Sequence, residues 1–214
     1  GAITGKLLPS DTVVDELVDE FTGAAVTVSL FDASNATLFI EAASLGLLGT
    51  ELPDAIETDG ELMASLERLR GAAGVRMGLA TEAADVPLSN PKIAIVSQPA
   101  DYATLDGTVV AASDVDLVVR AVSMERIHRA VPLTTGMSIA AAALYDGTLA
   151  AKVARIADER GQTIRVGHPS GVLVVGATVE QGEPVSISKT AVYRTARRLM
   201  EGAVLVPKDT LENV

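Results

Sequence analysis

Apolar positions along the chain mark most of the expected secondary structure. Ala24 to Phe31 and Ala36 to Ile40 are rich in β-branched residues, and the turn-favouring residues 32–35 separate them. This pattern predicts two strands joined by a tight break. Apolar residues at helical spacing from Glu61 to Met77 predict an amphipathic helix. Similar apolar runs predict further strands at 92–96, 115–122, 163–166, 172–179, 184–187 and 203–206.

The second half of the chain carries three more candidate helices. Met137 to Tyr145 has almost no polar face, which is typical of a buried helix. Thr148 to Arg160 has an amphipathic pattern, and Ser188 is a suitable cap for a helix over residues 189–200. Strands and helices do not alternate strictly. We therefore expect an α+β fold, with a largely antiparallel sheet curled around the buried central helix.

Composition and charge exclude several kinds of protein. The 214 residues carry a formal net charge of −11, which argues against a nucleic-acid partner because phosphates need Lys and Arg. The chain has no cysteine, and its two histidines, His128 and His168, are too far apart in sequence to suggest a metal site. No apolar run is long enough for a membrane span, and residues 1–6 do not resemble a signal peptide. The expectation is a soluble cytoplasmic protein.

The string Thr134-Thr135-Gly136-Met137-Ser138 is the best candidate for a binding site on physical grounds. It introduces the apolar helix, and the first turn of a helix offers free backbone N–H groups and a partial positive charge. Hydroxyl groups and a glycine beside those N–H groups would suit a carboxylate ligand. The alternative is that Thr134 or Thr135 only caps a structural helix. The bare sequence leaves both possibilities open.

Other polar residues have weaker claims to a site. Arg120 ends an apolar run, and an arginine near the end of a strand can bind a carboxylate with two hydrogen bonds. His168 and Ser170 belong to a tight turn and either contact a ligand or only form the turn. Asn35 is either a turn residue or an amide donor. No glycine-rich nucleotide motif and no nucleophile–base pair is present.

Eight strings of this sequence, taken in order, resemble the 2-methylaconitate cis-trans isomerase family. They are Thr4–Pro9 (TGKLLP), Leu30–Asn35 (LFDASN), Leu45–Pro53 (LGLLGTELP), Met77–Ala80 (MGLA), Pro91–Val96 (PKIAIV), Arg120–His128 (RAVSMERIH), His168–Gly171 (HPSG) and Tyr193–Gly202 (YRTARRLMEG). The family includes 4-oxalomesaconate tautomerases and methylitaconate isomerases. The resemblance covers nearly the whole chain.

The resemblance implies one half of a diaminopimelate epimerase-like fold, in which two similar halves enclose the active site. This chain resembles the C-terminal half, so the catalytic lysine and cysteine are expected upstream of Gly1. Asn35 and Asn90 match amides that hold ligand carboxylates, Arg120 matches an arginine near the cleft, and residues 134–138 match an anion-binding helix start. Two departures are Ala36, where the family usually has proline, and the missing helix cysteine.

The resemblance thus predicts an isomerase that shifts a C=C bond in 2-methylaconitate, in propionate and methylcitrate catabolism. Residues 1–201 would form the C-terminal half-domain, and residues 202–214 a tail that crosses back to the first half. No cofactor, metal, nucleotide or flavin is implied, and the expected partners are a small tricarboxylate and the N-terminal half in the same or a separate chain, with a second copy of this chain as a further option.

Three alternatives remain: a 4-oxalomesaconate-type tautomerase, a non-catalytic polycarboxylate-binding accessory protein, and a fragment with no role of its own. The expected half contains no catalytic residue and no metal ligand. The candidate substrate-binding residues are Asn35, Asn90, Arg120, Ser123, Met124, Thr134, Thr135, Gly136, Met137, Ser138, His168 and Ser170.

Overall fold

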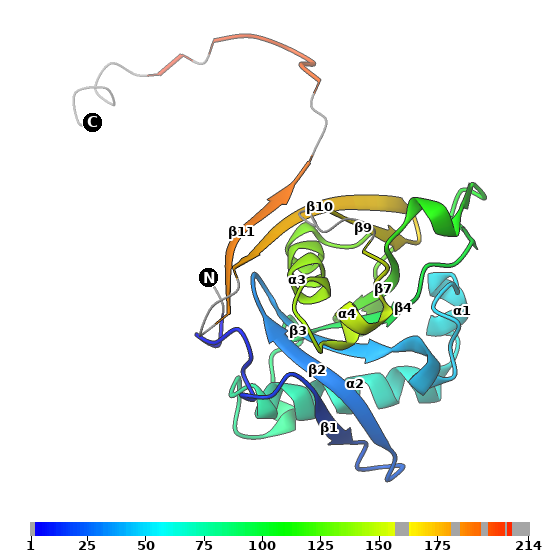
Figure 1. Ribbon diagram of the computed structural model, residues 1–214, viewed down its shortest axis with the longest axis vertical. Helices are drawn as coiled ribbons and strands as arrows, with labels where there is room; N and C mark the ends of the chain where they lie inside the picture. Colours follow the sequence, from blue (N-terminus) through cyan, green and yellow to red (C-terminus); the bar gives the residue numbers. More distant parts are fainter. Residues whose placement is uncertain (1–2, 157–162, 181–184, 194–196, 204, 207–214) are drawn as a thin grey trace.

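A computed structural model describes residues 3–156, 163–180, 185–193, 197–203 and 205–206, and statements below on what the structure contains refer to these residues. Its main sheet follows the order β1-β2-β3-β4-β7-β9-β10-β11, with β8 added beside β7 (Figure 1). The strands are β1 (Asp15–Val18), β2 (Ala25–Asp32), β3 (Ala36–Glu41), β4 (Lys92–Ser97), β7 (Leu117–Ser123), β8 (Arg126–Ile127), β9 (Thr163–His168), β10 (Gly171–Glu180) and β11 (Ser186–Val192).

Most neighbouring strands are antiparallel, which confirms the predicted largely antiparallel sheet. Two pairs are parallel, β3 with β4 and β7 with β9. A second, two-stranded sheet joins β5 (Tyr102–Ala103) to β6 (Val109–Val110). The helices are α1 (Pro53–Glu57), α2 (Gly60–Arg76), α3 (Leu133–Ala143) and α4 (Leu149–Val153). None of the described helices is both long and apolar enough to cross a membrane.

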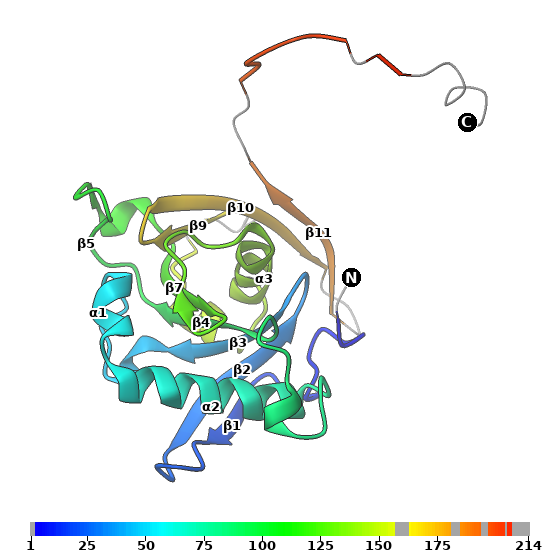
Figure 2. The ribbon, with the colours of Figure 1, turned by 180° about the vertical axis from the view of Figure 1, so that it is seen from behind.

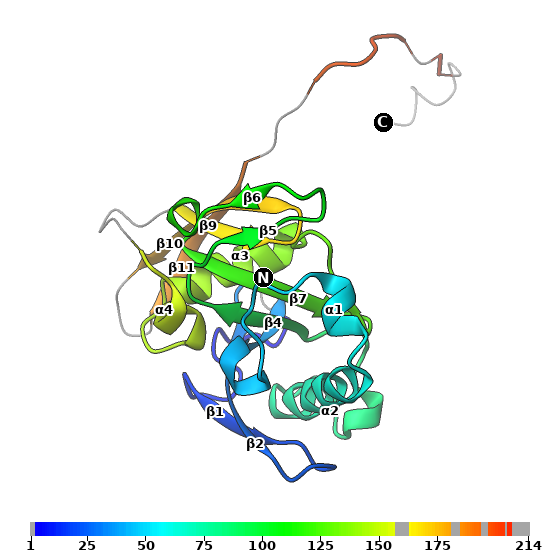
Figure 3. The ribbon, with the colours of Figure 1, turned by 90° about the vertical axis from the view of Figure 1, so that its right-hand side faces the viewer.

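Both faces of the central strands are buried, which explains their continuous apolar runs. In β4, Ala94 and Val96 join a core with α3 and α4, whereas Ile93 and Ile95 join a second core with α2. Alternate residues of a strand point to opposite faces, so one short run supplies both cores. Figures 2 and 3 show α2 beside β1 and β2, on the side of the sheet away from α3.

The apolar helix predicted near residue 137 is α3, and it is buried along most of its length. Ile139 and the four alanines that follow it are almost completely inaccessible to solvent. They share one core with residues of β2, β3, β4, β7, β9 and β10. Figure 1 shows α3 between the β2–β3 and β10–β11 parts of the sheet. Small alanine side chains allow this close approach of helix and strands.

The Thr4–Pro9 string holds the end of β2 in place. The backbone N–H and hydroxyl of Thr4 both donate to Oδ2 of Asp32, at 2.7 and 2.8 Å. The N–H of Asp32 in turn donates to the carbonyl of Leu7 at 2.9 Å. Leu7 and Leu8 pack against the α3 core. These contacts fix the turn after Asp32, which carries Asn35.

The predicted helix over residues 189–200 is wrong where the structure describes it, because β11 occupies Ser186–Val192. Thr178 pairs with Lys189 and Val179 with Ile187, so Ser188, the expected helix cap, is skipped by the ladder. Pairing with β10 outweighs the local helical preference. The other predicted helix, Thr148 to Arg160, is helical only from Leu149 to Val153, and its residues 157–160 lie outside the described part.

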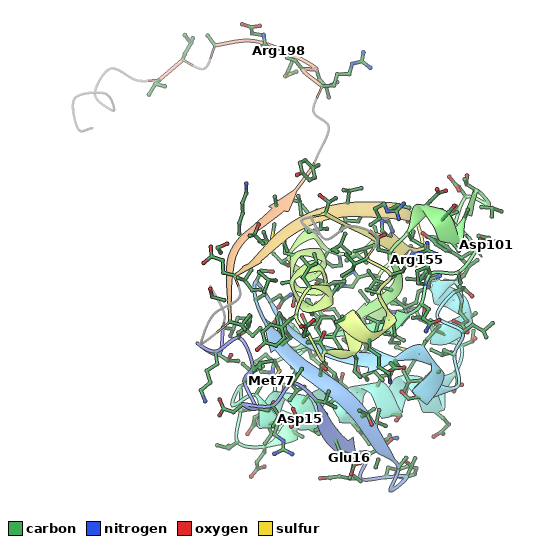
Figure 4. All side chains as sticks on the ribbon, viewed as in Figure 1. Asp15, Glu16, Met77, Asp101, Arg155 and Arg198 are labelled. Atoms are coloured by element: carbon green, nitrogen blue, oxygen red, sulfur yellow. The ribbon has the colours of Figure 1, made fainter. Side chains whose placement is uncertain are left out.

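Beyond β11, the described residues are neither helix nor strand. The strand predicted at 203–206 is absent at residues 203, 205 and 206, and Val204 lies outside the described residues. Leu199, Met200 and Leu205 are almost fully exposed. Figure 4 shows Arg198 on this segment, well away from the body of the protein.

Packing at Gly74 provides a test of the α2 layer. A Cβ added at Gly74 would lie 2.3 and 2.7 Å from the two methyl groups of Val86. Because the β-branched Val86 has few alternative rotamers, we expect Gly74→Ala to lower the free energy of unfolding by roughly 1–3 kcal/mol. Urea denaturation would measure the change.

Two controls isolate the overlap at Val86. Gly60→Ala, at the start of the same helix, meets no atom within 4 Å and should leave stability unchanged or slightly raised. In a protein that also carries Val86→Ala, Gly74→Ala should lower the free energy of unfolding by less. Equal stability of Gly74→Ala and Gly60→Ala would contradict the described packing.

Candidate functional site

Several strand ends meet at one end of the main sheet. We call this region the polar end and define it by Asn35, Asn90, Ser123, the 168–171 turn and the start of α3. The parallel strands β3 and β4 both begin here, and β7 ends here because it is antiparallel to β4. Ser34 donates a hydrogen bond to the carbonyl of Thr134 at 2.7 Å. That bond ties the Asn35 turn to the first turn of α3.

Asn35 and Asn90 occupy equivalent places on neighbouring strands. Thr37 is paired with Lys92 in parallel register, and each asparagine lies two residues before its paired position. Asn35 and Asn90 therefore lie just before β3 and β4. Adjacent strands of a sheet are about 4.8 Å apart. Asn35 is buried and Asn90 is partly buried. Arg70 donates to the carbonyl of Asn90 at 3.1 Å and thereby holds its backbone.

The start of α3 differs from the predicted cap. Pro132 occupies the N-cap position and makes no side-chain cap bond, so neither Thr134 nor Thr135 caps the helix. Thr135 and Ser138 are completely buried, and their hydroxyl oxygens have no hydrogen-bond partner among the described residues. Two unpaired buried hydroxyls at a helix start leave hydrogen-bonding capacity in the polar end.

Gly136 and Met137 have packing roles in this structure. A Cβ on Gly136 would lie 2.6 Å from a methyl group of Leu173, so the glycine allows β10 to approach α3. The sequence had suggested instead that Gly136 makes room for a ligand. Met137 is partly buried and packs against the α3 core.

Ser123 and Met124 lie where β7 turns into β8. Ser123 is buried, and Met124 is exposed with a positive φ of 52°. Ser123 shares the α3-facing side of β7 with Val119 and Ala121. Its hydroxyl accepts a short hydrogen bond from Nζ of Lys92. Ser123 is therefore part of the polar end, whereas Met124 forms the tight turn beside it.

Lys92 and His128 also belong to this end, although the sequence analysis did not select them. Lys92 begins β4 on the side that α3 covers, as Ala94 and Val96 show. His128 lies close enough for the charge of Lys92 to lower its pKa, after burial, which is the larger cause. A lysine at the head of an otherwise apolar strand was the available signal for this site.

Arg120 lies apart from these residues. It pairs with Ile95, which faces the α2 side, and so points away from α3. The fully buried guanidinium donates to the carbonyls of Glu51 and Val119 and lies 5.5 Å from the ring centroid of Tyr102. Burial lowers its pKa to about 10, so Arg120 stays charged at neutral pH. One terminal nitrogen of the guanidinium is buried without a hydrogen-bond partner among the described residues, and its charge acts on nearby His168. This geometry supports a structural role that brings Arg120 near His168 but not to the α3-facing side, where Ser123 and Lys92 lie.

The His168–Ser170 turn is anchored within the protein. Nδ1 of His168 accepts from the N–H of Ser170 at 3.1 Å, so this nitrogen carries no proton. The Ser170 hydroxyl donates to the carbonyl of Arg129 at 2.6 Å, which ties the turn to the segment leading into α3. Both side chains position backbone at the polar end. Among the described residues, no group of three or more His, Cys, Asp or Glu side chains could hold a metal ion.

The buried His168 predicts how stability depends on pH. Burial, and secondarily the charge of Arg120, lowers the pKa of His168 from 6.5 to about 4. Between these values the unfolded chain binds more protons than the folded one, so stability is full above pH 6.5 and falls as the pH drops towards 4. Between pH 7.5 and 5, the free energy of unfolding of the His168→Asn variant should fall by roughly 1–3 kcal/mol less than that of the wild type. Denaturation at pH 7.5 and 5 measures the difference, and equal losses in both proteins would contradict it.

Comparison with known proteins gives the relatives of this chain. It is 37% identical over 215 residues to the 3-methylitaconate isomerase of Eubacterium barkeri, covering 99% of this chain and 55% of that protein. It is 40% identical over 207 residues to the 2-methyl-aconitate isomerase of Shewanella oneidensis, covering 95% of this chain and 51% of that protein. The chain thus spans about half the length of the curated relatives it matches.

A solved structure agrees with the sequence relatives. The crystal structure of a methylitaconate-delta-isomerase superposes with a TM-score of 0.86 at 35% identity, over 98% of this chain and 54% of the other. The model of the PrpF protein family matches residues 1–207. This chain therefore belongs to the PrpF protein family, as the sequence resemblance to the methylaconitate isomerases predicted.

Proposed function

We propose that this chain is the carboxylate-binding half of an isomerase that moves a C=C bond in a small polycarboxylate, with 2-methylaconitate as the first candidate substrate. The names of its relatives support an isomerase of small carboxylic acids. The double bond moves when a proton is removed from an allylic carbon and returned elsewhere. Proton transfer of this kind needs correctly placed acid and base groups and no redox cofactor.

The polar end is the observation that carries this proposal. The start of α3, two neighbouring asparagines and the cation of Lys92 meet there. Backbone N–H groups at a helix start stabilise negative charge, both on a bound carboxylate and on an enolate-like intermediate. Holding a small acid in one orientation is itself a large part of catalysis. Asn35, Asn90, Ser123, Thr134, Thr135 and Ser138 are the proposed binding residues.

We also propose that a second half supplies the acid and base. The sheet and α3 would then form one half of an epimerase-like fold, curled around this central helix. The partner half is either another part of the same polypeptide or a separate chain. The fact that the relatives are about twice as long as this chain supports such an arrangement.

An activity assay tests the proposed function. In D₂O, isomerisation should exchange an allylic proton of 2-methylaconitate, which NMR detects directly. We expect no exchange with this chain alone, and exchange when it is joined to or mixed with the other half of a matching relative. The control is the other half of the relative mixed with heat-denatured samples of this chain.

The possible outcomes separate the alternatives. Turnover by this chain alone would show that it contains the catalytic groups. Faster turnover of 4-oxalomesaconate would make the tautomerase the better assignment. Tight polycarboxylate binding without turnover in any combination would favour a non-catalytic accessory protein.

The exposed apolar tail gives a second test. Leu199, Met200 and Leu205 are almost fully exposed, and exposed apolar segments favour association with another surface. We propose that the tail after β11 packs on the second half. Amides of residues 197–203, 205 and 206 should exchange with solvent rapidly in this chain alone and slowly once the second half is present. Slow, concentration-independent exchange in a demonstrated monomer would show that the tail belongs to this domain.

A further inference from the structure

Lys92 lies in an unusual setting for a lysine. It is partly buried at the head of β4, between Thr37 of β3 and the β7 terminus, on the side of the sheet that α3 covers. Its Nζ donates to the hydroxyl of Ser123, which is itself buried. An ammonium group has three hydrogens to donate. The bond to Ser123 therefore orients the group and leaves further donors for another partner.

The positive charge of Lys92 has no carboxylate partner within the described part of the chain. Three other buried or partly buried cations are paired with acids there, namely Arg68 with Asp19, Arg70 with Glu67 and Arg165 with Asp116, each at 2.6 Å. Arg120 has no acid and donates instead to two backbone carbonyls. Burial lowers the pKa of Lys92, and no neighbouring acid offsets this effect. A partly buried charge without a partner is costly, because it loses hydration that no acid replaces. A purely structural cation would be expected to have either an acidic neighbour or backbone carbonyl acceptors like those of Arg120, and among the described residues Lys92 has only the Ser123 hydroxyl.

His128 adds a second unpaired polar group next to this charge. Its Nε2 is buried and has no partner among the described residues. Burial and then the charge of Lys92 lower the pKa of His128, so the imidazole is neutral at pH 7. A neutral imidazole with its proton on Nε2 can donate one hydrogen bond. Lys92 and His128 together therefore offer one positive charge and two kinds of donor.

We infer that Lys92, oriented by Ser123 and assisted by His128, is the recognition site for one carboxylate group of a di- or tricarboxylate. A single ammonium beside a neutral imidazole balances the single charge of a carboxylate. The inference rests on the proposed function, because it assigns one group of that substrate to these residues. It gives Lys92 the role of specificity-determining cation that the sequence had suggested for Arg120.

Tricarballylate, a saturated tricarboxylate, is a suitable probe because it cannot be isomerised. Lys92→Met keeps an unbranched side chain only one atom shorter and removes its charge, and we expect tricarballylate to bind the full chain roughly ten- to a hundred-fold more weakly. Lys152→Met is the matched control, because Lys152 forms an exposed ion pair with Glu41. Calorimetric titration should give unchanged affinity for this control.

A spectroscopic readout distinguishes recognition from a structural effect. Bound carboxylate next to His128 should raise the pKa of its imidazole, which NMR follows in the wild type and in Lys152→Met. Ser123→Ala should weaken binding less than Lys92→Met, since it removes only the orienting bond. Equal tricarballylate affinity in Lys92→Met and wild type, or a His128 pKa that does not respond to saturating tricarballylate, would overturn the inference.

Failure of this inference is distinguishable from failure of the proposed function. In the protein joined to its second half, Lys92→Met should raise KM for the isomerised polycarboxylate much more than it lowers kcat. An unchanged KM with normal turnover would refute the Lys92 site and leave the isomerase standing. Tricarballylate binding that depends on Lys92, in a joined protein that isomerises no polycarboxylate, would support the site and refute the isomerase.

Discussion

The nearly complete burial of α3 beyond its first two residues is the constraint on which the rest of the structure depends. A helix built from Ile139 and consecutive alanines has no polar face to offer to water. Strands from both ends of the main sheet order must therefore cover it, and they do so with one shared core. Because the helix packs closely against the surrounding strands, as Gly136 does against Leu173, its first turn is fixed in direction. The polar end follows from that fixed direction.

Burial also separates residues that have similar chemistry. Arg120 and Ser123 are three positions apart on β7, so they point to opposite faces of the sheet. Arg120 is used to hold the loop carbonyl of Glu51 on the α2 side. Ser123 remains on the α3 side, where it meets Lys92. A cation that stabilises the fold and a cation free to meet a ligand are thus distinguished by their face and their partners.

The sequence predicted the long elements well, because their apolar patterns depend on burial that is nearly complete. The runs of β2, β4 and α3 are of this kind. The helix expected over residues 189–200 failed because Lys189 to Val192 pair with β10, and a strand ladder between distant segments leaves no local signal. Short elements such as α1 and β8 have too few residues to show a period.

The candidate site was predicted less completely than the fold. Asn35, Asn90 and the start of α3 are candidates from sequence, and the strand register and the Ser34–Thr134 hydrogen bond put them at the same end of the sheet. Alternate residues of a strand point to opposite faces, so the sequence positions of Arg120 and Ser123 were enough to predict that their side chains lie on opposite sides of the sheet. Lys92 was harder to find, because a lysine before an apolar strand is usually solvated. Its lack of an acidic partner depends on contacts between β4 and its neighbours, which only the three-dimensional structure shows.

The net charge of −11 is compatible with an anion site at the polar end. Exposed charges are screened over about 8–10 Å at physiological ionic strength, so most surface acids contribute little at Lys92. A partly buried cation such as Lys92 lies in a medium of lower dielectric constant, where its interaction with a nearby charge is stronger and less screened. The local field at Lys92 is therefore governed by its immediate neighbours. Because Lys92 is partly buried without an acidic partner among the described residues, an anion that approaches it meets an uncompensated positive charge in a medium of lower dielectric constant.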